Sequence, residues 1–308
     1  MSLLTLNKVS KTFGNNSVLD NVDLAIPKGS IYGFIGVNGA GKTTTMKLIL
    51  GLEEISSGEI KIDGEVVTFG QTKTNRFTGY LPDVPDFYGF MTAREYLKLC
   101  GEITGIPKKH LANKIGEMFK KVGLEDNKKQ IKTYSRGMKQ RLGVAQALLN
   151  EPKLLICDEP TSALDPNGRR EFLTLIASLK KEMTIIFSTH ILDDVERICD
   201  QVCILHNSKI VAHGSLTVLK QQYAQEQIEI QVEKKDDTLF TNLLDQLIKE
   251  EKIQAYTKKE TAYVVNYTQP YLAVTHTLFA KCEQKDIAPT LLRKVAPSLE
   301  QIFLEVTA

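Results

Sequence analysis

The stretch IGVNGAGKTTT, residues 35–45, decides the fold. Residues 36–43 match the spacing GxxxxGK[ST], whose glycines let successive backbone N–H groups point at one anion. An apolar run, SIYGFIG, precedes the loop, and a helix-forming run, KTTTMKLILGL, follows it. This order of strand, loop and helix predicts a phosphate site, with Lys42 at the β- and γ-phosphates and the Thr43 hydroxyl at Mg²⁺. A glycine-rich turn with a chance lysine is the competing interpretation, and the flanking segments argue against it.

Strands and helices alternate on both sides of this loop. Apolar residues at three- and four-residue spacing predict helices, and short continuous apolar runs predict buried parallel strands. Helices are expected at 92–105, 109–124, 136–149, 170–181 and 191–199. Strands are expected at 3–13, 17–26, 30–36, 153–160 and 183–190, with a hairpin-like pair at 201–214. This alternation predicts an α/β fold with a parallel sheet.

The character of the chain changes near residue 221. Strands are expected at 227–232, 253–257 and 261–267, and helices at 238–251, 270–284 and 297–306. This order, with room for a last strand near Ile287, predicts a small ferredoxin-like α+β unit. No catalytic constellation is visible in it. We therefore predict a main domain at 1–220 and an accessory domain at 221–308.

Polar side chains follow two of the predicted buried strands. Asp158 and Glu159 end one strand, and His190 ends the other. Two adjacent carboxylates at the end of a buried strand are costly unless a cation or water meets them. Beside the phosphate loop, Asp158 can hold the water shell of Mg²⁺, and Glu159 can orient or deprotonate the attacking water. Parallel strands end at one sheet edge, so His190 is expected near the γ-phosphate, although a purely structural histidine is the commoner case.

The segment YSRGM, residues 134–138, supplies a further motif. Ser135 suits a helix N-cap and Gly137 permits close approach, which by themselves indicate only a capped helix. The order of the phosphate loop, YSRGM, DEP (158–160), SALD (162–165) and STH (188–190) is far more specific. It resembles the ATPase subunit of an ATP-binding cassette (ABC) transporter over residues 3 to about 220. In that family the fold is a parallel sheet core with an antiparallel β subdomain and a helical subdomain.

The resemblance implies ATP and Mg²⁺ as cofactors and assigns roles to individual residues. It implies catalytic roles for Glu159 as base, His190 as switch histidine and Lys42, and metal contacts for Thr43, Asp83 and Asp158. The implied nucleotide-binding residues are Phe13, Gly36, Asn38, Gly39, Ala40, Gly41, Lys42, Thr43, Thr44, Ser135 and Gly137. Phe13 would stack on adenine, since a flat apolar face suits a base, and a core phenylalanine is the alternative.

In this family the YSRGM segment caps the γ-phosphate of ATP held by a facing subunit. The resemblance therefore implies a head-to-tail dimer with a second copy or a related subunit, and two ATP molecules at the seam. Two departures from the family pattern are present. Tyr134, Arg136 and Met138 replace three members of the usual Leu-Ser-Gly-Gly-Gln. Asp83 occupies the place of the usual glutamine, which adds negative charge beside the phosphates.

Charge, hydropathy and cysteine spacing indicate the partners and the cellular compartment expected of this ATPase. The net charge of +2 does not indicate a nucleic-acid partner, and none is expected. No apolar stretch approaches the roughly 18–20 residues that span a bilayer, and the N-terminus lacks the features of a signal peptide. The five cysteines show no CxxC pair, as expected of reduced thiols in a cytosolic protein.

We therefore expect an ATP-hydrolysing subunit that energises export through a separate transmembrane permease, bound peripherally on the cytoplasmic face of the membrane. The ending PSLEQIFL, residues 297–304, is similar to cassettes that serve compact permeases for drugs, antimicrobial peptides or polymers. The alternatives are a soluble cassette ATPase acting on ribosomes or DNA and a nucleotide sensor that does not hydrolyse. The single cassette without a sustained heptad pattern disfavours the first, and intact Lys42 and Glu159 disfavour the second.

Overall fold

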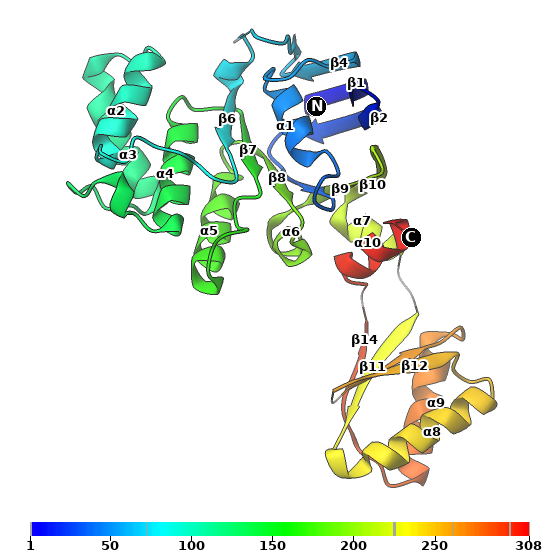
Figure 1. The fold of residues 1–308 in the computed structure, drawn as a ribbon. Coiled ribbons are helices and arrows are strands. Elements are labelled where there is room, and N and C mark those ends of the chain that lie inside the picture. Colours follow the sequence, from blue (N-terminus) through cyan, green and yellow to red (C-terminus); the bar gives the residue numbers. More distant parts are fainter. Residues whose placement is uncertain (1, 72, 224–225, 261, 296, 308) are drawn as a thin grey trace. The chain divides into compact units, whose positions relative to one another are not determined.

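The computed structural model describes residues 2–307 except 72, 224–225, 261 and 296 and divides the chain into two compact units (Figure 1). Unit 1 comprises residues 1–217 and 303–308, and unit 2 comprises residues 218–302. The sequence prediction instead placed all of 221–308 in the second domain. The difference arises because the end of the last helix, α10 (Leu299–Thr307), belongs to unit 1. A change of sequence character marks where a unit begins, but it does not show that the chain later returns.

Unit 1 contains two sheets. The antiparallel sheet has the order β2-β1-β4-β5 and is built from β1 (Ser2–Phe13), β2 (Asn16–Pro27), β4 (Ser57–Ile62) and β5 (Glu65–Val66). The central sheet has the order β10-β9-β3-β8-β7-β6. Its strands are β3 (Ile31–Ile35), β6 (Thr78–Leu81), β7 (Leu154–Asp158), β8 (Thr184–Thr189), β9 (Gln201–His206) and β10 (Lys209–Ser215). Only the β9–β10 pairing of this sheet is antiparallel.

Seven helices begin in the described part of unit 1 before residue 217. They are α1 (Lys42–Ile49), α2 (Ala93–Ile103), α3 (Lys108–Val122), α4 (Arg136–Leu148), α5 (Pro166–Leu179), α6 (Leu192–Ile198) and α7 (Leu216–Gln222), with short 3₁₀ turns at Asn75–Phe77 and Ile131–Thr133. The elements predicted between residues 3 and 214 are all present, within a few residues at their ends. The short strands β4, β5 and β6 were not predicted individually, because two to six residues give too little periodicity.

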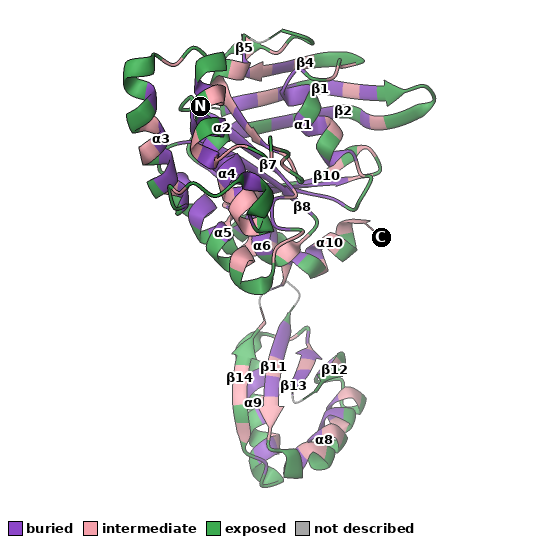
Figure 2. Ribbon diagram, turned by 60° about the vertical axis from the view of Figure 1, so that its left-hand side comes forward, coloured by how far each residue is buried: buried purple, intermediate pink, exposed green. Residues whose placement is uncertain are grey.

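The central sheet is packed on both faces, which makes the base of the phosphate loop rigid. Tyr32 and Phe34 of β3 are 1% exposed and belong to the core formed with α1 and the antiparallel sheet. Figure 2 shows the neighbouring strands β7 and β8 coloured as buried. On the opposite face, a Cβ atom at Gly33 would lie 2.7 Å from Cγ1 of Val195 on α6. The phosphate loop therefore follows a strand, β3, that is packed on both faces.

Unit 2 is a four-stranded antiparallel sheet with two helices. Its elements are β11 (Gln227–Val232), a 3₁₀ turn (Lys234–Asp236), α8 (Asp237–Lys249), β12 (Ala255–Lys259), β13 (Ala262–Asn266), α9 (Tyr271–Gln284) and β14 (Pro289–Lys294). The strand order is β12-β13-β11-β14. Ile228 and Ile230 of β11 pack against Phe240, Leu244 and Leu278 of the helices. The element order and the core on one face are those of the ferredoxin-like arrangement.

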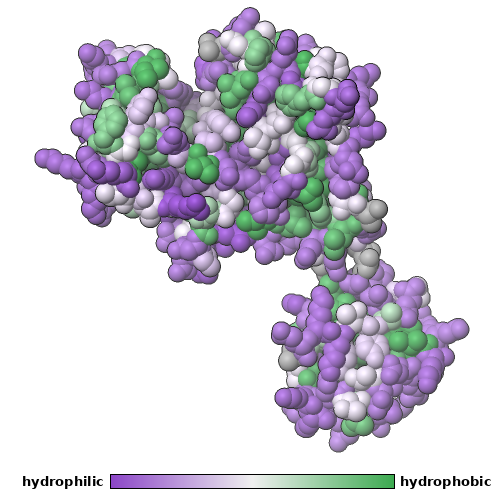
Figure 3. All heavy atoms as spheres, in the orientation of Figure 1, coloured by the Kyte–Doolittle hydropathy of each residue, from purple (hydrophilic) through white to green (hydrophobic). Residues whose placement is uncertain are grey.

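Most of the visible surface is polar. Figure 3 shows hydrophilic residues over most of the visible face, with apolar residues in scattered patches. In the described part of the chain, no helix is both long enough and apolar enough to cross a bilayer.

Candidate functional site

The phosphate loop joins β3 to α1 and needs glycine at two positions for steric reasons. Gly41, the N-cap of α1, has φ +106°, and a Cβ atom there would lie 2.9 Å from Cγ1 of Val18. A Cβ atom at Gly36 would lie 2.8 Å from the carbonyl oxygen of Leu205. Real Cβ atoms avoid such contacts, and L-residues rarely adopt that φ. The loop is therefore wrapped tightly around the start of α1, and the N–H of Ala40 donates to the carbonyl oxygen of Val37 at 3.1 Å within it. The N-terminus of α1 is left to face an anion.

Lys42 is the buried cation of the loop. It is 5% exposed, and its Nζ donates a hydrogen bond to the carbonyl oxygen of Gly36 at 2.7 Å. The same atom lies 3.1 Å from Oε1 of Glu159. A buried ammonium group is costly without such partners. The side chain is thus fixed at the point where the loop, α1 and the end of β7 meet.

Glu159 connects the ends of two neighbouring strands. Its backbone N–H donates to the carbonyl oxygen of Ser188 at 2.9 Å, and its own φ is +45°. Its Oε2 lies 2.8 Å from Nδ1 of His190. Such a φ is uncommon for a non-glycine residue, and it concentrates at functional sites. The two carboxylate oxygens therefore face different partners, Lys42 on one side and His190 on the other.

Asp158 is the most buried carboxylate beside the loop. It is 2% exposed, and its Oδ1 has no hydrogen-bond partner among the described residues. Burial raises the pKa of this carboxyl, the neighbouring Glu159 adds to the rise, and the hydroxyls of Thr43 and Ser188 and the charge of Lys42 act in the opposite direction. An unpartnered buried oxygen at this position is one that a cation would satisfy.

The donor set suits magnesium. Mg²⁺ prefers oxygen ligands, keeps several waters and is usually held by one or two protein oxygens together with substrate phosphates. The carboxylate of Asp158 and the hydroxyl of Thr43 provide such a pair. In the described part of the chain, no group of three or more His, Cys, Asp or Glu side chains forms an all-protein metal cage. The residues at this site therefore fit a metal that arrives with a phosphate ligand.

Asp83 lies in the loop between β6 and α2 and contacts two other parts of the site. Its Oδ1 accepts a hydrogen bond from Oγ of Ser162 at 2.8 Å, and its carbonyl oxygen accepts one from Nε2 of Gln140 at 2.8 Å. Oγ of Ser162 also lies 3.0 Å from the carbonyl oxygen of Glu159. Asp83 therefore links the start of the SALD segment to α4, a connection that the spacing of the motifs does not show.

An open cavity of about 520 Å³ brings most of the predicted residues together. It is lined by Phe13, Val18, Asn38, Gly39, Gly41, Lys42, Thr43, Thr44, Asp83 and Glu159. Phe13 is 46% exposed, with Nζ of Lys11 4.4 Å from its ring centroid, so it is not a core residue. This lining does not include the predicted residues Gly36, Ala40, Asp158 and His190. Val18 was not predicted, since a single apolar residue in a strand carries no functional signal.

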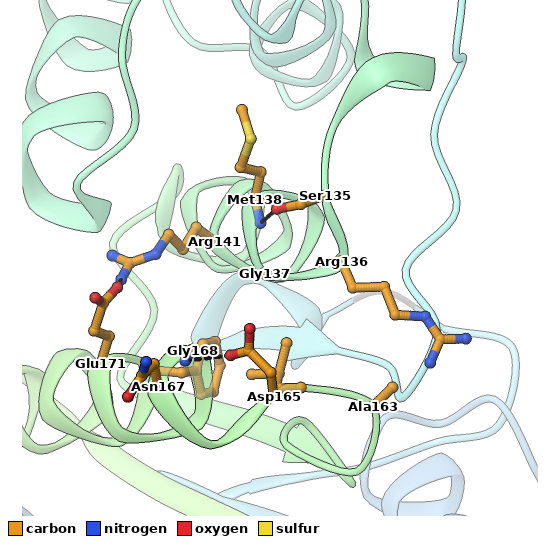
Figure 4. A pocket seen from close by; sticks show the side chains of 12 residues that line it. Ser135, Arg136, Gly137, Met138, Arg141, Ala163, Asp165, Asn167, Gly168 and Glu171 are labelled. Atoms are coloured by element: carbon orange, nitrogen blue, oxygen red, sulfur yellow. Dashed lines mark hydrogen bonds and ion pairs between the residues drawn. The ribbon is translucent and has the colours of Figure 1, made fainter.

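Ser135 and Gly137 line a different cavity, of about 500 Å³ (Figure 4). Its walls come from the start of α4 and from residues 163–172. Oγ of Ser135 accepts from the backbone N–H of Met138 at 3.2 Å, so the predicted N-cap is confirmed. In Figure 4 the side chain of Arg136 points away from Asp165 and Glu171. The two predicted phosphate contacts on α4 thus do not line the cavity of their own chain's phosphate loop.

Comparisons with known proteins agree with this geometry. The family described as ABC transporter matches residues 19–162. Over 305 residues, 99% of each chain, the sequence is 39% identical to the uncharacterized ABC transporter ATP-binding protein YxlF of Bacillus subtilis. It is 42% identical to the bacitracin transport ATP-binding protein BcrA of Bacillus licheniformis over 72% of each chain. It is 39% identical to the lantibiotic transport ATP-binding protein SrtF of Streptococcus pyogenes over 68% of this chain and 89% of that one.

A solved structure of an ATP-binding subunit of an ABC transporter is also similar, with a TM-score of 0.65 and 34% identity, covering 72% of this chain and 93% of that one. These matches confirm the predicted resemblance and fold class. The names of the relatives favour a transport function over an ATPase acting on ribosomes or DNA and over a sensor. The chain belongs to the ATP-binding subunits of ABC transporters, a family of ATPases.

Proposed function

We propose that two cassettes hydrolyse ATP with Mg²⁺ at the seam of a head-to-tail dimer and thereby drive a separate transmembrane permease. The observation that carries this proposal is the separation of the two half-sites. Lys42 and Glu159 face one cavity, while Ser135 and Gly137 face another. Each half lacks the groups that the other holds, and a second copy arranged head to tail would bring both to one nucleotide.

ATP binding is assigned to the first half-site. The exposed ring of Phe13 would offer a stacking face to adenine, and the phosphate loop with Lys42 would hold the phosphates. Thr43 and Asp158 would hold Mg²⁺, which when bound neutralises charge on the β- and γ-phosphates. The unpartnered Oδ1 of Asp158 supports this assignment. Asp83 faces the same cavity and would contact the water shell of the metal.

Catalysis is assigned to Glu159 as general base, oriented by His190. The contact of 2.8 Å between Oε2 and Nδ1 holds the carboxylate in one orientation. Nδ1 of His190 faces Glu159, and the other ring nitrogen, Nε2, would face the γ-phosphate of the bound ATP.

The permease contact is assigned to exposed aromatic residues before α2. Tyr88 is 56% exposed and Phe90 69% exposed, with ring centroids 5.9 Å apart, and Tyr88 also lies 6.3 Å from the ring of Tyr96. Aromatic side chains are enriched at binding hot spots, and a cytosolic helix of the permease would cover these. This contact would place the chain on the cytoplasmic face of the membrane. The bacitracin and lantibiotic relatives make an antimicrobial peptide the first cargo to test.

Glu159→Gln tests the proposal. The variant should bind ATP as the wild type does but hydrolyse it roughly 10²- to 10⁴-fold more slowly, the usual contribution of a general base. It should also accumulate as an ATP-dependent dimer in light scattering. Glu182→Gln is the matched control, because that carboxylate is half exposed and pairs with Lys121. Hydrolysis by Glu159→Gln at the wild-type rate would show that Glu159 is not the base.

A further inference from the structure

Asp194 is a buried carboxylate that lines neither of the two cavities described above. It is 1% exposed and lies on α6, four residues after His190. Its Oδ2 accepts a hydrogen bond from Oγ1 of Thr161 at 2.7 Å, and its Oδ1 accepts one from Nε of Arg169 at 2.6 Å. A buried carboxylate is tolerated only when it is paired and hydrogen-bonded. Both oxygens are engaged, so this carboxylate cannot rotate without breaking a charge-assisted bond.

The two partners of Asp194 come from segments that carry other parts of the site. Thr161 is itself 1% exposed and lies two residues after Glu159. Its carbonyl oxygen accepts from the backbone N–H of Leu164, inside the SALD segment. Arg169 lies in the first turn of α5, and its backbone N–H donates to the carbonyl oxygen of Asp165 at 2.8 Å. Asp165 in turn caps α5 through the N–H of Gly168 at 2.6 Å.

These contacts join three chain segments at one carboxylate. One follows Glu159, one follows the SALD segment, and one follows His190. Among the described residues, the side chains of Glu159 and His190 meet at one contact of 2.8 Å, and catalytic groups lose efficiency when they are misplaced by about 1 Å. The pairing of β7 with β8 aligns the two backbones, and a rigid link behind the strand ends would keep the segments that follow them in place as well.

We propose that Asp194 is a positioning residue for ATP hydrolysis. Through Thr161 and Arg169 it holds Glu159, His190 and the SALD segment in one arrangement, although it touches neither cavity. This inference rests on the catalytic roles proposed for Glu159 and His190. The inference goes beyond those two roles, because it assigns an effect on the rate of hydrolysis to residues that line neither cavity.

The test compares Asp194→Asn, Thr161→Val and Arg169→Gln with the wild type in steady-state ATP hydrolysis. Each rate is divided by the number of sites that bind a fluorescent ATP analogue, so that unfolded protein does not count. We expect kcat to fall by roughly 10- to 100-fold, while KM for ATP stays near the wild-type value. Because the residues act as one unit, the double variant of Asp194 and Thr161 should lose little more than the worse single variant.

Asp200→Asn is the matched control. Asp200 lies two residues after the end of α6, and its carboxylate also has two partners, Nζ of Lys180 at 2.6 Å and the backbone N–H of Ile31 at 3.0 Å. Among the contacts of the described residues, Asp200 has none with Thr161 or Arg169. The kcat of the Asp200→Asn variant should therefore match that of the wild type. Thr161→Val keeps shape and volume close to the native residue, so it remains informative if Asp194→Asn does not fold.

An unchanged kcat per binding-competent site in Thr161→Val and Arg169→Gln would overturn the inference. A loss of folded protein with unchanged kcat would do the same, since it would show a structural role only. These results are distinguishable from failure of the proposed function. If Glu159→Gln also hydrolyses at the wild-type rate, the assignment of the base is wrong. If only the variants around Asp194 do so, the positioning role alone is wrong.

Discussion

Replacing Lys42 by methionine removes one buried ammonium group and leaves most of the side-chain volume in place. Nζ of Lys42 lies 2.7 Å from the carbonyl oxygen of Gly36 and 3.1 Å from Oε1 of Glu159. The side chain is 5% exposed, so water cannot substitute freely for the lost group. Glu159 keeps His190 as a partner at Oε2, and we therefore expect Lys42→Met to fold.

The size of the effect follows from the burial of this cation. Truncating one partner of a buried, hydrogen-bonded charge pair costs about 2–5 kcal/mol of binding free energy. Since 1.4 kcal/mol is a factor of ten, Kd for ATP should rise by roughly 30- to 4,000-fold. In the free protein the ammonium already has Glu159 and Gly36 as partners. Exchanging these for phosphates offsets part of the gain, so the lower half of the range is expected.

Isothermal titration calorimetry of ATP and of AMP at fixed Mg²⁺ tests this expectation. AMP lacks the β- and γ-phosphates that Lys42 is proposed to contact, so its affinity should not change and serves as the control for folding. An unchanged Kd for ATP in a folded variant would refute the assignment of Lys42. An equal loss for AMP would show that the substitution damages the loop rather than one phosphate contact.

Three further outcomes are expected. Asp83→Gln should weaken the link to Ser162. Because the substitution removes a negative charge near the phosphates, the variant should bind ATP several-fold more tightly without Mg²⁺ in the same calorimetric assay. Burial holds the pKa of Asp158 above its ordinary value, and a metal ligand must be deprotonated. As the pH is lowered, the Mg²⁺ concentration needed for half-maximal hydrolysis should therefore rise. This rise should begin at a higher pH than it would if the metal ligand were an aspartate of ordinary pKa. Phe13→Ala should weaken ATP binding by about 1–3 kcal/mol, the value of one stacked base, and leave tripolyphosphate affinity unchanged in a competition assay.

Much of the site was predictable because parallel strands place their ends at one edge of a sheet. The spacing around Lys42 and the polar ends of the strands before Glu159 and His190 predicted that these residues lie near one another, and in the structure Glu159 contacts both of the others. Their contacts with one another depend on rotamers and on the positive φ of Glu159, which spacing does not encode. The contact of Asp83 with Ser162 joins the loops that follow the neighbouring strands β6 and β7, and no local pattern in the sequence signals it.

The buried contacts of Asp194 could not be predicted from the sequence either. An acidic residue in the first turn of a helix is ordinary, since it favours the helix dipole. Its burial becomes apparent only when α5 and α6 pack together. The same holds for α10, which was predicted as a helix but whose residues from Phe303 onwards group with unit 1. Periodicity predicts elements well, whereas long-range packing decides which of their polar residues meet.

The central claim is that each nucleotide site is built from two chains, and mixing two inactive variants tests it most directly. Ser135→Arg blocks the α4 half-site, and Lys42→Met disables the phosphate half-site, so neither homodimer has an intact pair. A mixed dimer holds one intact site, formed by the unaltered halves of both chains. Equal mixing should therefore restore about a quarter of the wild-type ATP hydrolysis, since half of the dimers are mixed and each has one of two sites intact. No gain on mixing, with both variants folded, would contradict the account.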